Sequence, residues 1–157
     1  MKVMSTSKGI GGQLTDFRKL VEASKRITFV GSVGFCTPFA ELMAYVIRGS
    51  AMEMNFVPDT RLEDARSIIS TPSGMQLGEL ADFHADTVVL LGGLAMPKIG
   101  IEPVKTKEMI DSILEGSEKK LIIGVCFQSI FQNQKWPDTI DFDFIIDADL
   151  TSEVKQP

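Results

Sequence analysis

Residues 25–45 read KRITFVGSVGFCTPFAELMAY, and this stretch decides the fold of the 157-residue chain. Residues 27–30 form a run of β-branched and aromatic side chains, which predicts a buried strand ending at Gly31. Thr37 suits the N-cap of a helix, and Pro38 suits its first turn. Apolar residues then recur at helical spacing. The stretch therefore predicts a strand, a small-residue turn and a helix, the first βα unit of an α/β domain.

Four further strands are expected along the chain. Thr87–Leu91 and residues 121–125 are continuous apolar runs, which are typical of strands buried on both faces of a parallel sheet. Residues 52–57 form another β-rich run before Pro58. The last run, residues 141–147, alternates acidic residues with Phe142, Phe144 and Ile146, a pattern typical of an edge strand. The expected helices cover residues 15–24, 37–46, 60–66, 75–83 and 106–114.

Strands that alternate with helices predict a parallel, doubly wound sheet with right-handed crossovers. We expect one α/β domain over residues 1–157, with three α/β/α layers and a mostly parallel five-stranded sheet of the flavodoxin-like or Rossmann-like kind. The expected strand order is 2-1-3-4-5, with residues 1–12 as a flexible leader. In this order the winding reverses between the first and third strands, so a ligand is expected at the carboxyl ends of the strands there.

Composition excludes several classes of partner and site. A net charge of −5 with scattered basic residues argues against a nucleic-acid partner. The chain lacks a membrane-length apolar run and an N-terminal signal segment, so we expect a cytoplasmic protein with no membrane partner. A homodimer is expected for a small α/β domain. His84 is the only histidine, which excludes most zinc sites and most histidine-dependent triads. We expect no metal site, because the acidic cluster near the C-terminus follows strand alternation and fits a solvated face: Asp138, Asp141, Asp143, Asp147 and Asp149.

Small residues at two predicted strand ends are candidates for binding a ligand. Backbone N–H groups and a helix start at this position favour an anion. The glycine spacing is not that of a dinucleotide fingerprint, and no P-loop lysine is present, so no cofactor is assigned. The alternative is a tight turn with no ligand. The candidate binding residues are Gly31, Ser32, Gly34, Cys36, Thr37, Gly92, Gly93 and Phe127.

Cys36 and Cys126 are the only cysteines, and their separation in a cytoplasmic domain favours free thiols over a disulfide. Cys36 stands at a predicted helix start, a position that can activate a thiol, although a buried and inert thiol is the alternative. Cys126 directly follows a predicted strand, as the nucleophile does on the elbow of α/β hydrolases. Both are candidate catalytic residues.

Residues 85–131 contain ADTVVLLGG and MIDSILEGSEKKLIIGVCFQSIF. This part of the chain resembles the class I glutamine amidotransferase and PfpI-type superfamily, in which one strand ends in Gly-Gly and the next ends in a nucleophilic cysteine. The resemblance implies that Cys126 is the nucleophile and that Glu41 is the acid beside it. The sequence departs from the PfpI-type pattern at Phe127 and Gln128, where that pattern has His and Gly, and no later histidine completes an amidotransferase triad.

The whole chain also resembles an uncharacterised family of small proteins from methanogenic archaea, on residues 34–48 (GFCTPFAELMAYVIR) and 55–60 (NFVPDT). That resemblance implies an archaeal source, and no activity is assigned to the family. Three functional classes stay open: a module that binds a small, anionic ligand at the carboxyl edge, a cysteine-dependent enzyme, and a non-catalytic interaction scaffold. The missing histidine favours the binding module.

Overall fold

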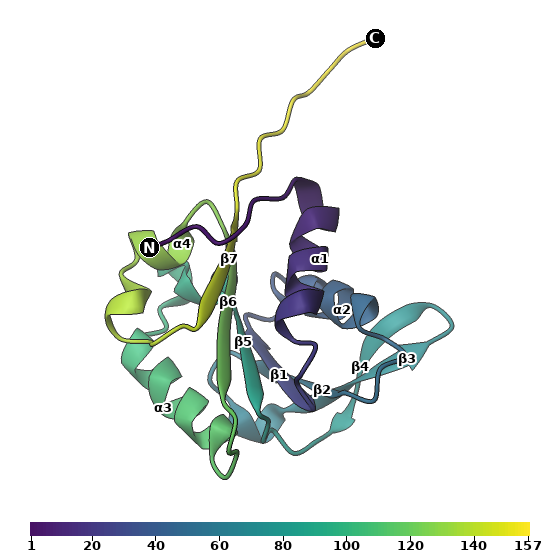
Figure 1. Ribbon diagram of the computed structural model, residues 1–157, viewed down its shortest axis with the longest axis vertical. Helices are drawn as coiled ribbons and strands as arrows, with labels where there is room; N and C mark the ends of the chain where they lie inside the picture. The colour runs from purple at the N-terminus through teal and green to yellow at the C-terminus, as the bar shows by residue number, and fades with distance from the viewer.

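A mixed sheet of seven strands in the order β4-β3-β2-β1-β5-β6-β7 runs through the computed structural model, which describes residues 1–157 (Figure 1). Five strands, β2, β1, β5, β6 and β7, pair in parallel, while β3 and β4 add an antiparallel hairpin at one edge. The predicted order 2-1-3-4-5 is confirmed for the five predicted strands, but the sheet is larger and mixed. The strands are β1 (Arg26–Gly31), β2 (Glu53–Pro58), β3 (Arg66–Thr71), β4 (Gly74–Leu80), β5 (Thr87–Leu91), β6 (Leu121–Phe127) and β7 (Phe144–Ala148).

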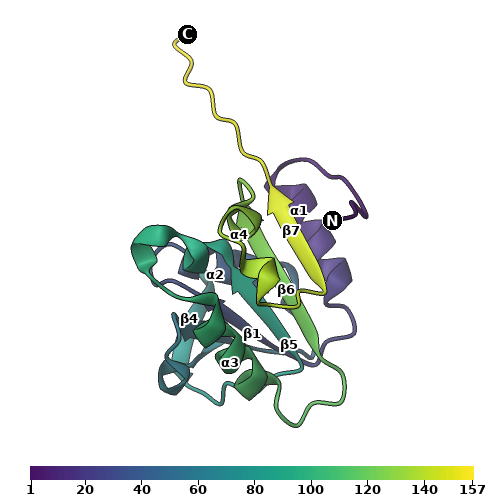
Figure 2. The same ribbon diagram turned by 90° about the vertical axis from the view of Figure 1, so that its left-hand side faces the viewer.

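Helices cover both faces of the sheet because the central strands are apolar on both sides. Ile27 and Phe29 of β1 pack under α1 and α2, whereas Val30 packs in the core beneath α3 and α4. Figure 2 looks onto the face that α3 and α4 cover. No helix is both long enough and apolar enough to span a membrane. The helices are α1 (Gly9–Leu20), α2 (Thr37–Val46), α3 (Pro103–Leu114) and α4 (Ile130–Asn133), with 3-10 turns η1 (Leu62–Asp64), η2 (Gly92–Ala95), η3 (Pro97–Ile99) and η4 (Trp136–Asp138).

The first helix begins at Gly9, earlier than the predicted start at residue 15 and within the stretch predicted as a leader. Burial explains the early start, because Gln13 is buried and Leu14 packs against the core cluster that contains Phe17. Ser7 also folds back over the first turns, donating a hydrogen bond of 2.7 Å to Asp16. Tertiary packing thus offsets the low helix propensity of the glycines in this turn.

The two helices predicted over residues 60–66 and 75–83 are wrong. In their place the chain forms η1 and then the β3–β4 hairpin, whose two-residue loop, Pro72 and Ser73, lies in the predicted turn. The reason is long-range pairing: β3 joins the edge of β2, and Ile68 and Met75 are buried under α2. Local sequence does not report such pairing.

The predicted alternation of the last strand is also wrong in part. Strand β7 lies at the sheet edge as expected, paired only with β6, but it begins at Phe144. Phe142 precedes the strand and packs beneath α3 and α4 together with Ile145, whereas Ile146 packs on the α1 and α2 side. Both faces of this edge strand therefore carry apolar contacts.

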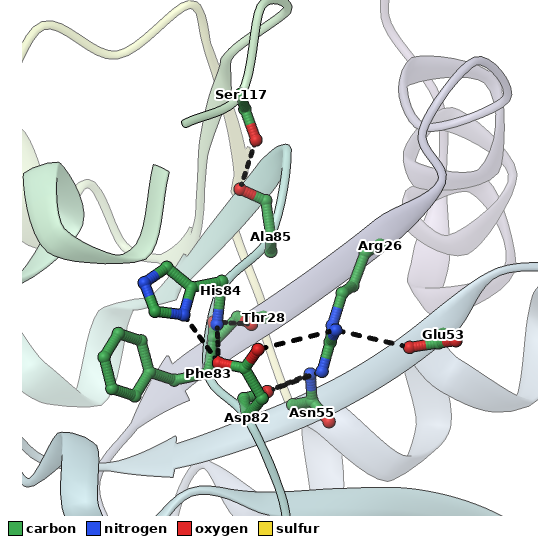
Figure 3. A network of polar contacts seen from close by, with 9 residues as sticks. All are labelled: Arg26, Thr28, Glu53, Asn55, Asp82, Phe83, His84, Ala85 and Ser117. Atoms are coloured by element: carbon green, nitrogen blue, oxygen red, sulfur yellow. Dashed lines mark hydrogen bonds and ion pairs between the residues drawn. The ribbon is translucent and has the colours of Figure 1, made fainter. Parts of the chain in front are cut away.

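An extended segment, residues 81–86, connects β4 to β5 and is held by polar side chains of the first strands (Figure 3). Thr28 Oγ1 donates to the Phe83 carbonyl at 2.8 Å. Asn55 Nδ2 and Arg26 Nη2 donate to the Asp82 carbonyl at 3.0 and 2.7 Å. Thr28 and Asn55 are buried, so these bonds satisfy polar groups that would otherwise be costly inside the sheet.

Candidate functional site

A cavity of about 170 Å³ lies at the carboxyl ends of β5 and β6, beside the turn that joins β1 to α2. This is the predicted switch point of the sheet. Eight of its ten lining residues are hydrophobic, and none carries a formal charge. The lining residues are Phe35, Cys36, Phe39, Leu91, Gly92, Gly93, Met96, Val125, Phe127 and Ile130.

Neighbouring elements supply the apolar walls in register. Leu91 and Val125 are paired across β5 and β6, so their side chains project together on the α2 side of the sheet. Phe39, from α2, packs against Phe127, from the end of β6, with 5.1 Å between the ring centroids and an interplanar angle of 54°. Phe35 stands at the mouth with 58% of its surface exposed. The cavity is thus lined largely by aromatic and aliphatic side chains.

Glycines let the backbone approach Cys36 closely on one side of the cavity. A Cβ atom at Gly31 would overlap Cys36 Cβ, and one at Gly93 would overlap Cys36 Sγ. The thiol is buried and lies 3.3 Å from Ser32 Oγ, within hydrogen-bond distance. Gly31 and Ser32 therefore contact Cys36 but do not line the cavity. Of the predicted binding residues, four line it: Gly92, Gly93, Cys36 and Phe127.

Thr37 does not cap helix α2 as predicted. The N-cap position is taken by Cys36, whose backbone is helical and whose side chain makes no capping bond. Thr37 Oγ1 instead accepts a long hydrogen bond of 3.4 Å from Gly34 N, where φ is +82°. Gly34 and Thr37 belong to the turn and lie outside the lining of the cavity.

Cys126 lies inside strand β6, which continues to Phe127, and its side chain packs on the α3 and α4 side of the sheet. The left-handed turn comes later, at Gln128 and Ser129. Burial, reinforced by the negative charge of Asp147, raises the pKa of the Cys126 thiol to about 12. Its Sγ donates to Asp147 Oδ1 at 3.5 Å. A thiol in this environment stays protonated at neutral pH.

The structure does not gather the three catalytic candidates into one site. Gly92 lies against Cys126 and Gly93 lies against Cys36, so the glycine pair separates the two thiols. Glu41, on α2, is not among the residues of the cavity. A catalytic role for any of them stays a prediction.

Sequence reasoning missed most of the apolar lining. Two signals were available, because Leu91 and Val125 end two predicted strands and the phenylalanines at 35 and 39 flank a predicted helix start. No sequence pattern indicated the other two, Met96 between η2 and η3 and Ile130 at the start of α4. The missed residues are Phe35, Phe39, Leu91, Met96, Val125 and Ile130.

Comparison with known proteins identifies archaeal relatives of this chain. The chain is 43% identical over 151 residues to "Uncharacterized protein MJ1183" from Methanocaldococcus jannaschii, covering 94% of this chain and 90% of that protein. It is 37% identical over 155 residues to an "Uncharacterized protein" from Methanothermobacter thermautotrophicus, covering 98% of each. A crystal structure of a protein of unknown function from M. thermautotrophicus matches with a TM-score of 0.92 at 35% identity, covering 100% of this chain and 99% of that one.

These relatives confirm the predicted resemblance to an uncharacterised family from methanogens. Their names assign no activity, so the amidotransferase resemblance stays a prediction. Residues 8–151 match the model of a family described as "Uncharacterized protein conserved in archaea". The chain therefore belongs to this archaeal family, DUF2124.

Proposed function

We propose that the protein is a non-catalytic module that binds a small, largely apolar ligand in the cavity at the carboxyl edge of the sheet. The observation that carries the proposal is the lining itself, in which Phe35, Phe39 and Phe127 meet aliphatic strand ends around an uncharged hollow. In α/β sheets this edge, at the point where the winding reverses, is the usual place for a ligand. Mostly apolar cavities with few polar groups are typical of small-molecule sites.

The volume limits the size of the ligand. A dry apolar cavity of about 150 Å³ suffices for benzene, so the present cavity of about 170 Å³ suits one small ring or a short branched chain. The sequence favours an anion here, yet no lysine or arginine lines the cavity. We propose an apolar body inside, with any carboxylate or phosphate of the ligand at the mouth, beside the start of α2.

A cysteine-dependent enzyme is the less favoured reading. Catalysis by Cys126 needs a thiolate, and the pKa of about 12 opposes one at neutral pH. Cys36 does reach the cavity, but the only histidine, His84, bonds Asp82 in the segment between β4 and β5. Neither thiol therefore has a histidine beside it to act as a general base.

Ligand-observed NMR tests the proposal, with benzene, indole and benzoate as probes. We expect saturation transfer to benzene and indole in the natural protein and its loss in Met96→Trp, where the larger ring fills the cavity. Ile69→Trp is the matched control, because Ile69 is 45% exposed on the hairpin strand β3 and lies outside the lining. Transfer to no probe, or transfer that survives Met96→Trp in a folded variant, would contradict the proposal.

A further inference from the structure

Exposed apolar side chains gather around the mouth of the cavity. Val33 and Phe35 project from the turn between β1 and α2, with 62% and 58% of their surfaces exposed. Phe39, Met96 and Phe127, which are half-buried, line the cavity beside them. These five residues, here called the rim patch, form an uncovered apolar surface at the carboxyl edge. Patches of this kind mark interaction sites more often than isolated exposed residues do.

The chain itself contains a segment suited to cover such a surface. Residues 149–157, here called the C-terminal arm, follow β7 and extend away from the body in both views (Figures 1 and 2). Every residue of the arm is exposed. Within it, Leu150 is half exposed and Val154 is completely exposed, whereas Glu153 and Lys155 pair with each other at 2.8 Å. Leu150 and Val154 are thus two apolar side chains, in an otherwise polar arm, that pack on no part of their own core.

The start of the arm is fixed next to the cavity. Gln128, the neighbour of Phe127, donates from Nε2 to Asp149 Oδ1 at 2.6 Å and accepts from Leu150 N at 2.7 Å. Its backbone N–H also bonds the Ala148 carbonyl at 3.0 Å. These bonds direct the arm outward, so its own rim patch stays uncovered. The seven residues beyond Leu150 span roughly 23 Å when extended.

We infer that two copies of this chain associate through their carboxyl edges, each C-terminal arm lying across the partner's rim patch. Each copy has one rim patch and one arm, so two copies related by a twofold axis use both of each, and no further copy can add. Val154 of each arm then lies over the mouth of the opposite cavity. This inference goes beyond the proposed function. The two are tested separately, because sedimentation measures self-association and NMR measures ligand binding.

Sedimentation velocity over a wide range of concentration tests the inference. We expect the full chain to sediment as a dimer, and deletion of residues 151–157 to weaken self-association by at least about tenfold. Val154→Asp and Phe35→Asp should weaken it comparably. Ile69→Asp is the matched control, because Ile69 is 45% exposed on the hairpin strand β3, away from the rim patch. Circular dichroism checks that each variant is folded.

A crosslink identifies where the arm lies. In Val33→Cys/Val154→Cys, oxidation should give a covalent dimer on a non-reducing gel, since the two natural cysteines are buried. A full chain that stays monomeric overturns the inference, as does a dimer that neither the deletion nor the rim substitutions weaken. A disulfide formed only within one chain overturns it too. A monomeric deletion variant that still binds benzene leaves the proposed function in place.

Discussion

At the scale of single residues, the tightest constraint in the site is the contact between Gly93 and Cys36. A Cβ atom at position 93 would overlap Cys36 Sγ and approach Ser32 Oγ to 2.8 Å. We expect Gly93→Ala to lower the free energy of unfolding by about 1–3 kcal/mol, as overpacking does, and Cys36→Ala to restore part of that loss. Urea denaturation of the single and double variants measures both effects.

Gly11 provides the control for that substitution. It lies inside α1, where a Cβ atom would meet no other atom within 4 Å and the backbone is not left-handed. Because alanine is the better helix former, Gly11→Ala should stabilise the protein by up to ~1 kcal/mol. A Gly93→Ala variant as stable as Gly11→Ala would show that the contact is not tight.

Cys126 makes the stability of the protein sensitive to alkaline pH. Its thiol pKa is raised from 9.0 to about 12 in the folded protein, first by burial and then by Asp147. Above pH 9 the unfolded chain releases this proton while the folded protein keeps it, so stability present below that pH is lost as pH rises. The loss is at most ~1.4 kcal/mol per pH unit.

Urea unfolding below and above pH 9 measures this dependence. Cys126→Ala should show a shallower alkaline loss than the natural protein, because only the thiol differs between them. In the folded natural protein, Cys126 should also resist iodoacetamide until it unfolds. Equal slopes in the two proteins, or rapid alkylation of folded Cys126, would refute the assignment of a buried, protonated thiol.

At the scale of elements, the segment between β4 and β5 depends on side chains of β1 and β2 rather than on a helix of its own. Thr28→Val keeps the shape of the side chain but leaves the Phe83 carbonyl without its bond of 2.8 Å. We expect a loss of roughly 1–3 kcal/mol of stability, the cost of an unsatisfied buried polar group. Faster amide hydrogen exchange over residues 81–86 would locate the effect.

Thr15→Val is the appropriate control for that change. Thr15 is exposed on α1, and its hydroxyl bonds only the Gly11 carbonyl of the same helix. Its substitution should change stability by no more than ~0.5 kcal/mol. If both valine variants proved equally stable, the hydrogen bond from Thr28 to residues 81–86 would make no contribution to stability.

At the scale of the whole molecule, α1 is part of the core although it precedes the first βα unit. Phe17 and Val21 are fully buried, and Phe17 contacts Phe29 with 5.9 Å between ring centroids. Burying each such side chain contributes about 1.5–3 kcal/mol, so deletion of residues 1–21 should abolish cooperative thermal unfolding or lower its midpoint sharply. Deletion of residues 1–6 should leave the midpoint near that of the full chain. Circular dichroism follows both, and equal midpoints would place α1 outside the core.

Much of the architecture follows from local sequence. The runs at residues 27–30, Thr87–Leu91 and 121–125 are apolar on every side chain or nearly so, and only a strand covered on both faces buries them all. Their alternation with helices predicts parallel pairing. The pair Gly92 and Gly93, at the end of one predicted strand, predicts one side of the cavity. These features depend on neighbours in the chain, so periodicity predicts them.

Tertiary structure decided the hairpin, the start of α1 and the membership of the site. Residues 66–80 are strands because β2 offers an open edge and α2 covers Ile68 and Met75, partners distant in sequence. The two thiols separated because Cys36 enters the core under α2, while the alternation of β6 turns Cys126 to the opposite face. By itself the sequence determined which segments are buried strands and where the winding reverses. Only packing over long separations decided which side chains meet there, since such contacts leave no local period.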